Sequence, residues 1–238
     1  MANCITKHIP NTLTSLNVLS GCIAIIFAYE GLFEQAAICI AAGAVFDFFD
    51  GMSARLVGVS SPLGKELDSL ADMTTFGVAP AMMVFAMLSE MLDELYPDTD
   101  SLFITFGPCF AFLLAIFSAL RLAKFNIDER QTTSFVGLPT PANALFWIGI
   151  ALTYVNGELG FLANPWIIGA LVVLMSWLLV AEIPMFSFKF KDLSWTHNRV
   201  RYCFIVVAIA SLALFRETGF AVVIALYVLA SLLTHGRQ

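Results

Sequence analysis

Charged side chains are scarce in this chain of 238 residues, where Asp, Glu, Lys and Arg together make up 13%. A soluble domain carries about 25%. Apolar residues account for 59% of the chain, and the mean hydropathy is +0.85. So few charges cannot cover a folded globule of this size, and so many apolar residues exclude a disordered chain. The composition therefore predicts a polytopic membrane protein.

Cysteine is also sparse, and basic residues are outnumbered by acidic ones. The five cysteines form no C-x-x-C pair, which argues against a cysteine metal site and against a disulfide framework. The net charge is −6, from 18 acidic and 12 basic residues. Because the phosphate backbone selects positive surfaces, we expect no nucleic acid among the partners.

Long apolar runs follow one another along the chain, separated by turn-forming residues such as Glu30, Pro62 and Pro97. A helix needs about 20 residues to cross the hydrocarbon core of a bilayer. We therefore expect an all-α polytopic membrane bundle of about eight transmembrane helices. The expected spans lie near residues 10–29, 33–56, 66–89, 101–123, 138–156, 164–182, 200–215 and 218–234.

The basic residues predict how this bundle is oriented. With eight spans and the N-terminus inside, 11 of the 12 basic residues fall on the inner side, and only Arg216 falls outside. The positive-inside rule then places both termini in the cytoplasm and makes the cell's inner membrane the expected location. The inner residues are Lys7, Arg55, Lys65, Arg121, Lys124, Arg130, Lys189, Lys191, Arg199, Arg201 and Arg237.

Four carboxylates stand where the second and third expected spans meet the inner side. Asp47 and Asp50 are three residues apart, and Asp68 and Asp72 are four apart, so each pair lies on one helix face. A hairpin around Pro62 would bring the two pairs together. Carboxylates near hydrocarbon are costly unless they are compensated, and divalent cations with oxygen ligands compensate them. The pattern predicts one or two ions of Mg²⁺, Mn²⁺ or Ca²⁺.

Small residues and an arginine accompany the carboxylates. Gly51, Ala54 and Gly64 leave room for a ligand against the helices, and Arg55 can bind a phosphate with two hydrogen bonds. Together with the metal site, they suggest an enzyme that acts on a diphosphate at the membrane surface. The same carboxylates also fit a cation or solute transporter, or a structural role.

The pattern Asp47-x2-Asp50-Gly51-x2-Ala54-Arg55-x8-Gly64-x3-Asp68-x3-Asp72 resembles the signature of the CDP-alcohol phosphotransferase family at every fixed position. The opening Ile9-Pro10-Asn11-x2-Thr14 is similar to the family's N-terminal element. The resemblance implies one integral-membrane domain over residues 1–238, with a six-helix core at about 9–182 and two further spans at about 200–234. It also implies a homodimer.

The resemblance further implies a role for each matched position. The four carboxylates would bind two divalent ions, and Asp68 and Asp72 would be catalytic, with Asp72 as the candidate general base. The remaining matched residues would bind the CDP part of the substrate. These residues are Asn11, Thr14, Gly51, Ala54, Arg55 and Gly64.

A second stretch, residues 118–126 followed by 135–142, resembles the CDP-diacylglycerol–serine O-phosphatidyltransferases within that family. This implies transfer of the phosphatidyl group from CDP-diacylglycerol to L-serine, giving phosphatidylserine and CMP. Arg121 and Lys124 would bind the serine carboxylate and the lipid phosphate, and Asn126 and Thr140 the serine ammonium or hydroxyl. The alternative interpretations are membrane-surface anchors for the two basic residues and a helix C-cap for Asn126.

Other functions fit parts of the pattern. The same chemistry could use another acceptor, such as inositol phosphate or glycerol phosphate. A membrane prenyltransferase also binds a diphosphate through aspartates and Mg²⁺, although Gly51, Ala54, Arg55 and Gly64 fit that class poorly. A cation or solute transporter predicts metal-dependent uptake and no CMP release.

Overall fold

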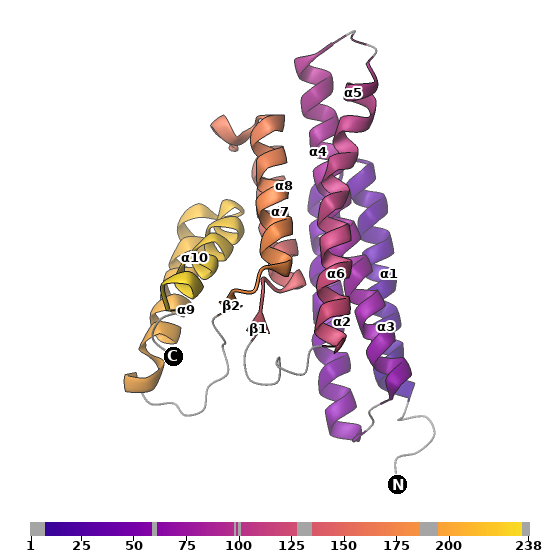
Figure 1. The fold of residues 1–238 in the computed structure, drawn as a ribbon, viewed down its shortest axis with the longest axis vertical. Helices are drawn as coiled ribbons and strands as arrows, with labels where there is room; N and C mark the ends of the chain where they lie inside the picture. The colour runs from indigo at the N-terminus through magenta and orange to yellow at the C-terminus, as the bar shows by residue number, and fades with distance from the viewer. Residues whose placement is uncertain are drawn as a thin grey trace.

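The computed structural model describes residues 8–58, 61–97, 99, 101–127, 135–185 and 195–234. These residues form a bundle of long helices with one small antiparallel strand pair near its middle (Figure 1). Several residues of the orientation argument lie outside the described ranges, as do both chain ends. They are Lys7, Arg130, Lys189, Lys191 and Arg237.

The N-terminal half builds four helical units that are long and apolar enough to cross a membrane. The second helix in chain order is the 25-residue α2, and the third unit continues without a break for 34 residues. The units consist of α1 (Ile9–Tyr29); α2 (Phe33–Val57); α3 (Pro62–Asp72), the π-helical η2 (Met73–Val78) and α4 (Ala79–Leu95); and α5 (Leu102–Phe106), the 3₁₀-helical η3 (Gly107–Phe112) and α6 (Leu113–Ile127). The chain is an integral membrane protein.

The C-terminal half contributes four shorter apolar helices in the described ranges. They are α7 (Thr140–Val155), α8 (Pro165–Val180), α9 (Trp195–Phe215) and α10 (Thr218–Thr234), with the 3₁₀ turn η5 (Gly160–Leu162) before α8. Each coincides with an expected span to within a few residues. The predicted fold class, a helical membrane bundle of about eight helices, is confirmed.

Helix α3 begins earlier than expected because of its cap. The Ser61 hydroxyl accepts a hydrogen bond of 3.0 Å from the Gly64 backbone N–H, and Pro62 occupies the first turn. The expected span began at residue 66, whereas the helix begins at Pro62. The cap therefore fixes the helical phase of the two aspartates that follow on α3.

The π-helical segment η2 directly follows Asp72 and packs closely against α1 and α2. The Thr75 hydroxyl donates a 2.9 Å hydrogen bond to the Asn17 backbone carbonyl. Glycine makes this approach feasible, since a Cβ on Gly21 would lie 2.9 Å from the Thr75 Cα, and one on Gly43 would lie 2.5 Å from the Thr75 Cγ2. Such π segments inside α-helices are frequent at functional sites.

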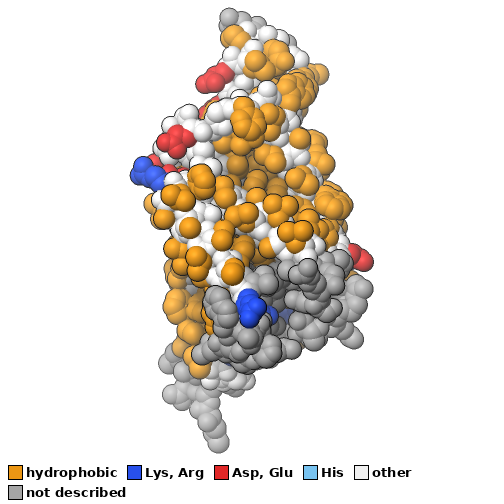
Figure 2. All heavy atoms as spheres, turned by 90° about the vertical axis from the view of Figure 1, so that its left-hand side faces the viewer, with side chains coloured by type: hydrophobic (Ala, Val, Ile, Leu, Met, Phe, Trp, Pro, Cys, Tyr) orange, Lys and Arg blue, Asp and Glu red, His pale blue; other side chains and the backbone are white. Residues whose placement is uncertain are grey.

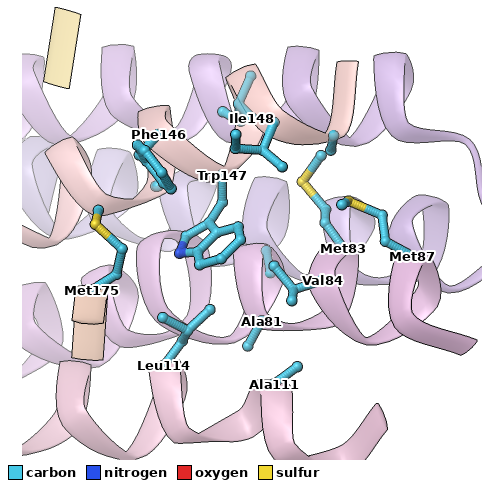
Figure 3. Close-up of a cluster of buried hydrophobic side chains, with 14 of the residues drawn as sticks. Ala81, Met83, Val84, Met87, Ala111, Leu114, Phe146, Trp147, Ile148 and Met175 are labelled. Atoms are coloured by element: carbon cyan, nitrogen blue, oxygen red, sulfur yellow. The ribbon is translucent and has the colours of Figure 1, made fainter. Parts of the chain in front are cut away.

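The apolar core lies where α4, α6, α7 and α8 meet. Trp147 of α7 is fully buried and faces Val84 of α4 and Leu114 of α6, with Met175 of α8 nearby (Figure 3). The outer surface is also apolar: Figure 2 shows hydrophobic side chains over the middle of the described part of one face, with charged groups toward its edges. A surface of this kind suits hydrocarbon surroundings.

A short strand pair, which the sequence did not predict, ties α7 to the end of α8. Strand β1 (Phe135–Val136) runs antiparallel to β2 (Pro184–Met185). Gly137 has a φ of +77°, and its N–H donates to the Ile183 carbonyl at 2.9 Å. A Cβ there would come within 2.6 Å of the Leu179 carbonyl oxygen, so this turn requires glycine.

We expect Gly21→Ala to destabilise the protein by about 1–3 kcal/mol, because the added methyl group overlaps the Thr75 backbone. Thermal unfolding in detergent measures this effect. Gly169→Ala in α8 is the matched control, since a Cβ there meets nothing within 4 Å. Equal melting temperatures for the two variants would contradict the close packing of α1 against η2.

Candidate metal centre and active site

Three aspartates converge at one end of the bundle. Asp47 and Asp50 lie on the last turns of α2, and Asp68 lies on α3 after the Ser61 cap. One carboxylate oxygen from each of the three lies within 4.8 Å of the others. The helical spacing therefore produces the carboxylate convergence that the sequence suggested for these three residues. We call Asp47, Asp50 and Asp68 the acidic cluster.

The fourth carboxylate, Asp72, borders the acidic cluster from the last residue of α3. It is within electrostatic range of Asp47 and Asp68. Its Oδ1 is buried, and none of the described residues forms a hydrogen bond with it. A buried carboxylate oxygen without a hydrogen-bond partner is costly, and a bound cation would offset that cost.

Asp50 is oriented by the first helix. Its side chain is buried, with 5% exposure, and its Oδ2 lies 2.6 Å from the Thr14 hydroxyl of α1. That distance is typical of a hydroxyl donating to an ionised carboxylate. Thr14, predicted to contact the nucleotide, therefore directly positions a residue of the acidic cluster.

A cavity of about 250 Å³ opens beside the acidic cluster, between α1, α2 and α3. It includes seven of the residues predicted for metal and CDP binding, together with three that were not predicted. The lining residues are Pro10, Asn11, Thr14, Asp50, Gly51, Ala54, Ser61, Gly64, Lys65 and Asp68. Small side chains at Gly51, Ala54 and Gly64 keep this space open.

Arg55 lies near the cavity without lining it. Its side chain is exposed, and its Nη2 is 3.9 Å from the point where Gly51 would carry a Cβ. The guanidinium of Arg55 is thus free to turn toward a ligand in the cavity. Long basic side chains of this kind bind phosphate through two parallel hydrogen bonds.

The residues predicted to bind the acceptor alcohol lie in different environments. Arg121 is buried, with 8% exposure, and is within electrostatic range of Asp72. Lys124, three residues later on α6, points outward and forms a 3.2 Å ion pair with Glu182. A three-residue step leaves the two side chains only about 60° apart around the helix, so packing against neighbouring helices, and not the spacing, buries Arg121 and leaves Lys124 partly exposed. The structure therefore brings only Arg121 of this pair to the carboxylates.

Asn126 and Thr140 also differ from each other. The Asn126 amide donates to the Ser69 hydroxyl at 2.8 Å, and its backbone carbonyl accepts from the Lys65 ammonium at 2.9 Å. Asn126 thus links α6 to α3 and does not act as an isolated helix cap. Thr140 is buried at the start of α7, with 1% exposure, and its hydroxyl forms no hydrogen bond with the described residues.

Sequence reasoning missed several polar residues near these groups. Ser61 and Lys65 line the cavity, and the Ser-Pro helix start was the signal that could have placed them. Asn143 and Ser118 are fully buried, and the Asn143 amide and the Ser118 hydroxyl form no hydrogen bonds with the described residues. Their position inside apolar spans was the signal that could have identified Asn143 and Ser118, because polar residues at membrane depth are often functional.

The acidic cluster could hold a metal ion. Its donors are carboxylate oxygens, the ligands that hard divalent cations prefer. The unpartnered Asp72 oxygen at its border, and the mutual repulsion of the carboxylates, both favour a bound cation. Beside such an ion, the cavity would present small residues and a lysine to an anionic ligand.

A helical membrane bundle with an acidic cluster beside a cavity lined by small residues and a lysine fits a membrane enzyme that acts on a phosphorylated substrate. Residues 7–182 match the family described as CDP-alcohol phosphatidyltransferase, and this chain belongs to that family. The resemblance seen in the sequence is therefore confirmed, and the chain is a phosphotransferase. The family match favours this class over the transporter and prenyltransferase alternatives.

Individual relatives agree with the family. The chain is 33% identical over 183 residues to the CDP-diacylglycerol–serine O-phosphatidyltransferase of Bacillus subtilis (strain 168), covering 77% of this chain and 92% of that protein. It is 34% identical over 184 residues to the protein of the same name from Mycobacterium leprae, covering 74% of this chain and 57% of that protein. It is also 33% identical over 169 residues to the archaetidylserine synthase of Methanothermobacter thermautotrophicus, covering 70% of this chain and 66% of that protein.

We expect Asp68→Asn to weaken Mn²⁺ binding by more than about tenfold, since one charged ligand is lost and each tenfold is worth about 1.4 kcal/mol. Calorimetric titration of the purified protein with Mn²⁺ measures the affinity. Asp93→Asn, an exposed carboxylate on α4 outside the acidic cluster, is the control and should bind Mn²⁺ normally. Equal affinity in the two variants would argue against a metal at the acidic cluster.

Proposed function

We propose that this protein transfers the phosphatidyl group of CDP-diacylglycerol to L-serine, releasing CMP and forming phosphatidylserine. The observation that carries the proposal is the acidic cluster with its adjoining cavity, in a chain 33% identical over 183 residues to an enzyme of that name. The cavity's small residues and nearby arginine suit a diphosphate, which is the group that joins the nucleotide to the lipid.

The donor binds in the cavity between α1, α2 and α3. Asn11 and Thr14 contact the nucleotide from α1, while Gly51, Ala54 and Gly64 leave space for it. Arg55 turns inward to bind the diphosphate. The lipid tails then extend from the cavity into the surrounding bilayer.

Asp47, Asp50, Asp68 and Asp72 hold the divalent metal, which we propose to be two ions of Mg²⁺ or Mn²⁺, with Ca²⁺ as the alternative. When bound, the metal stabilises negative charge on the diphosphate and on the leaving CMP. Thr14 keeps Asp50 in position through its 2.6 Å hydrogen bond.

Asp72 is the proposed general base. It accepts the proton of the serine hydroxyl, and the serine oxygen attacks the β-phosphorus of CDP-diacylglycerol in line. The new bond joins the serine oxygen to that phosphorus, and the bond from the same phosphorus to the CMP oxygen breaks. Asp68, close to Asp72 on the same helix face, supports this step as the second catalytic carboxylate.

Arg121 binds the serine carboxylate, supported by its buried position next to Asp72. Thr140, whose hydroxyl forms no hydrogen bond with the described residues, binds the serine ammonium or hydroxyl. Lys124 and Asn126 would have to leave Glu182 and Ser69 before contacting serine or the lipid phosphate. We therefore propose that Lys124 and Asn126 contribute less to acceptor binding than Arg121 does.

The proposed location is the inner membrane, with the acidic cluster and both termini facing the cytoplasm. Arg55, Lys65 and Arg121 are at the acidic-cluster end, as the positive-inside rule requires. A positive cytoplasmic face also attracts an anionic nucleotide lipid. The homodimer implied by the family resemblance stays a prediction.

The test is CMP release from CDP-diacylglycerol by the purified protein in detergent. We expect release with L-serine and Mg²⁺ or Mn²⁺, and loss of release when EDTA removes the metal. Asp50→Asn should lower the rate by about 10²-fold or more while the protein remains folded. Release with glycerol phosphate or inositol phosphate, and none with serine, would refute the serine assignment.

A further inference from the structure

The last two described helices, α9 and α10, form a hairpin beyond the family match. That match ends at residue 182, and the hairpin spans Trp195–Thr234. It packs beside α7, with α10 lying along that helix (Figure 1). The family core does not explain what this hairpin contributes.

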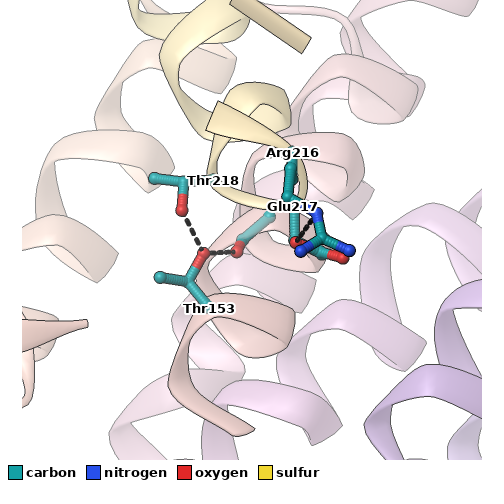
Figure 4. Close-up of polar contacts among 5 residues, drawn as sticks. Thr153, Arg216, Glu217 and Thr218 are labelled. Atoms are coloured by element: carbon teal, nitrogen blue, oxygen red, sulfur yellow. Dashed lines mark hydrogen bonds and ion pairs between the residues drawn. The ribbon is translucent and has the colours of Figure 1, made fainter. Parts of the chain in front are cut away.

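Two contacts fix the position of α10 along α7. A Cβ on Gly149 would lie 2.6 Å from the Ala221 backbone nitrogen, so glycine brings the two helices into direct contact. The hydroxyls of Thr153 and Thr218 form a 2.9 Å hydrogen bond next to the Arg216–Glu217 turn (Figure 4). Both contacts lie at the end of α7 remote from the acidic cluster, and they set the register of the pair.

From these contacts α10 runs antiparallel to α7, toward the acidic-cluster end. Ala221, Ile224 and Tyr227 recur every three residues, and all three are buried on this face. Tyr227 lies nine residues beyond Thr218, which is about 14 Å along a helix. The register fixed at Thr218 therefore carries Tyr227 along α7 toward its acidic-cluster end.

Tyr227 is within electrostatic range of the Arg121 guanidinium. The phenol ring is 6% exposed and packs edge-on against Phe204 of α9, with ring centroids 6.0 Å apart. Arg121 is also within electrostatic range of Asp72, and its Nε forms no hydrogen bond with the described residues. A buried guanidinium needs fixed polar neighbours, and a phenol oxygen can accept one of its N–H groups.

We propose that Tyr227 positions Arg121 for binding the acceptor alcohol, so that the α9–α10 hairpin forms one wall of the acceptor site. This rests on the proposed function, in which Arg121 binds the acceptor's carboxylate. Tyr227 acts through Arg121 and is a positioning residue. The donor cavity and the acidic cluster lie between α1, α2 and α3, so they do not depend on the hairpin.

The experiment compares Tyr227→Phe with Tyr154→Phe in the full-length protein. Both changes remove one phenol oxygen, but Tyr154 lies near the remote end of α7, against Phe33. We expect Tyr227→Phe to raise the KM for serine about five- to tenfold. Its KM for CDP-diacylglycerol, its Mn²⁺ affinity and its melting temperature should match those of the wild type, and Tyr154→Phe should leave the KM for serine unchanged.

Rescue provides a second measurement. Tyr227→Gln supplies an amide oxygen that can accept from a guanidinium, so its KM for serine should be lower than that of Tyr227→Leu. An unchanged serine KM in Tyr227→Phe would overturn the proposal. So would a loss that is equal for both substrates and accompanied by a lower melting temperature, since that outcome indicates packing alone.

Failure of the proposed function gives a different result. If the wild-type protein releases CMP with another alcohol but not with serine, the serine assignment is wrong. The same comparison of KM values, made with the alcohol that reacts, then decides the role of Tyr227. A KM change for that alcohol supports the positioning role, and its absence overturns it.

Discussion

The repulsion among carboxylates at one end of an apolar bundle is the constraint on which the rest of this structure depends. Asp47, Asp50 and Asp68 place oxygens within 4.8 Å of one another, and Asp72 adds a fourth charge at their border. Such a group is costly without a cation, so the surrounding helices must hold it in place against its own repulsion. The Thr14 hydroxyl and the Ser61 cap provide part of that support.

Close helix packing supplies the rest of the support for the carboxylates. Gly21 and Gly43 let the π-helical segment after Asp72 lie directly against α1 and α2. Small residues at Gly51, Ala54 and Gly64 instead leave a cavity between α1, α2 and α3. A tightly packed region thus adjoins an open one, an arrangement that can hold a functional site in position while admitting a ligand.

Much of the fold was predictable because its signals are local. Each expected span coincides with a helical unit, since apolar length and turn residues act within a few residues of each other. The strand pair Phe135–Val136 with Pro184–Met185 was not predictable, because it joins segments almost 50 residues apart and each strand has two residues. In the same way, Arg121 and Lys124 were both expected to bind the acceptor or the lipid phosphate, but neighbouring helices buried the first and left the second with Glu182.

The sequence alone determined that the chain is a helical membrane protein and which acidic residues lie on common helix faces, because composition and helical periodicity are properties of short segments. Only the tertiary structure decided which of those residues share a cavity, and that Thr14 holds Asp50. It also decided that Tyr227 of α10 comes within electrostatic range of Arg121 of α6. These neighbours are set by packing between helices distant in sequence, where one close contact such as Gly149 with Ala221 fixes the register of every residue that follows.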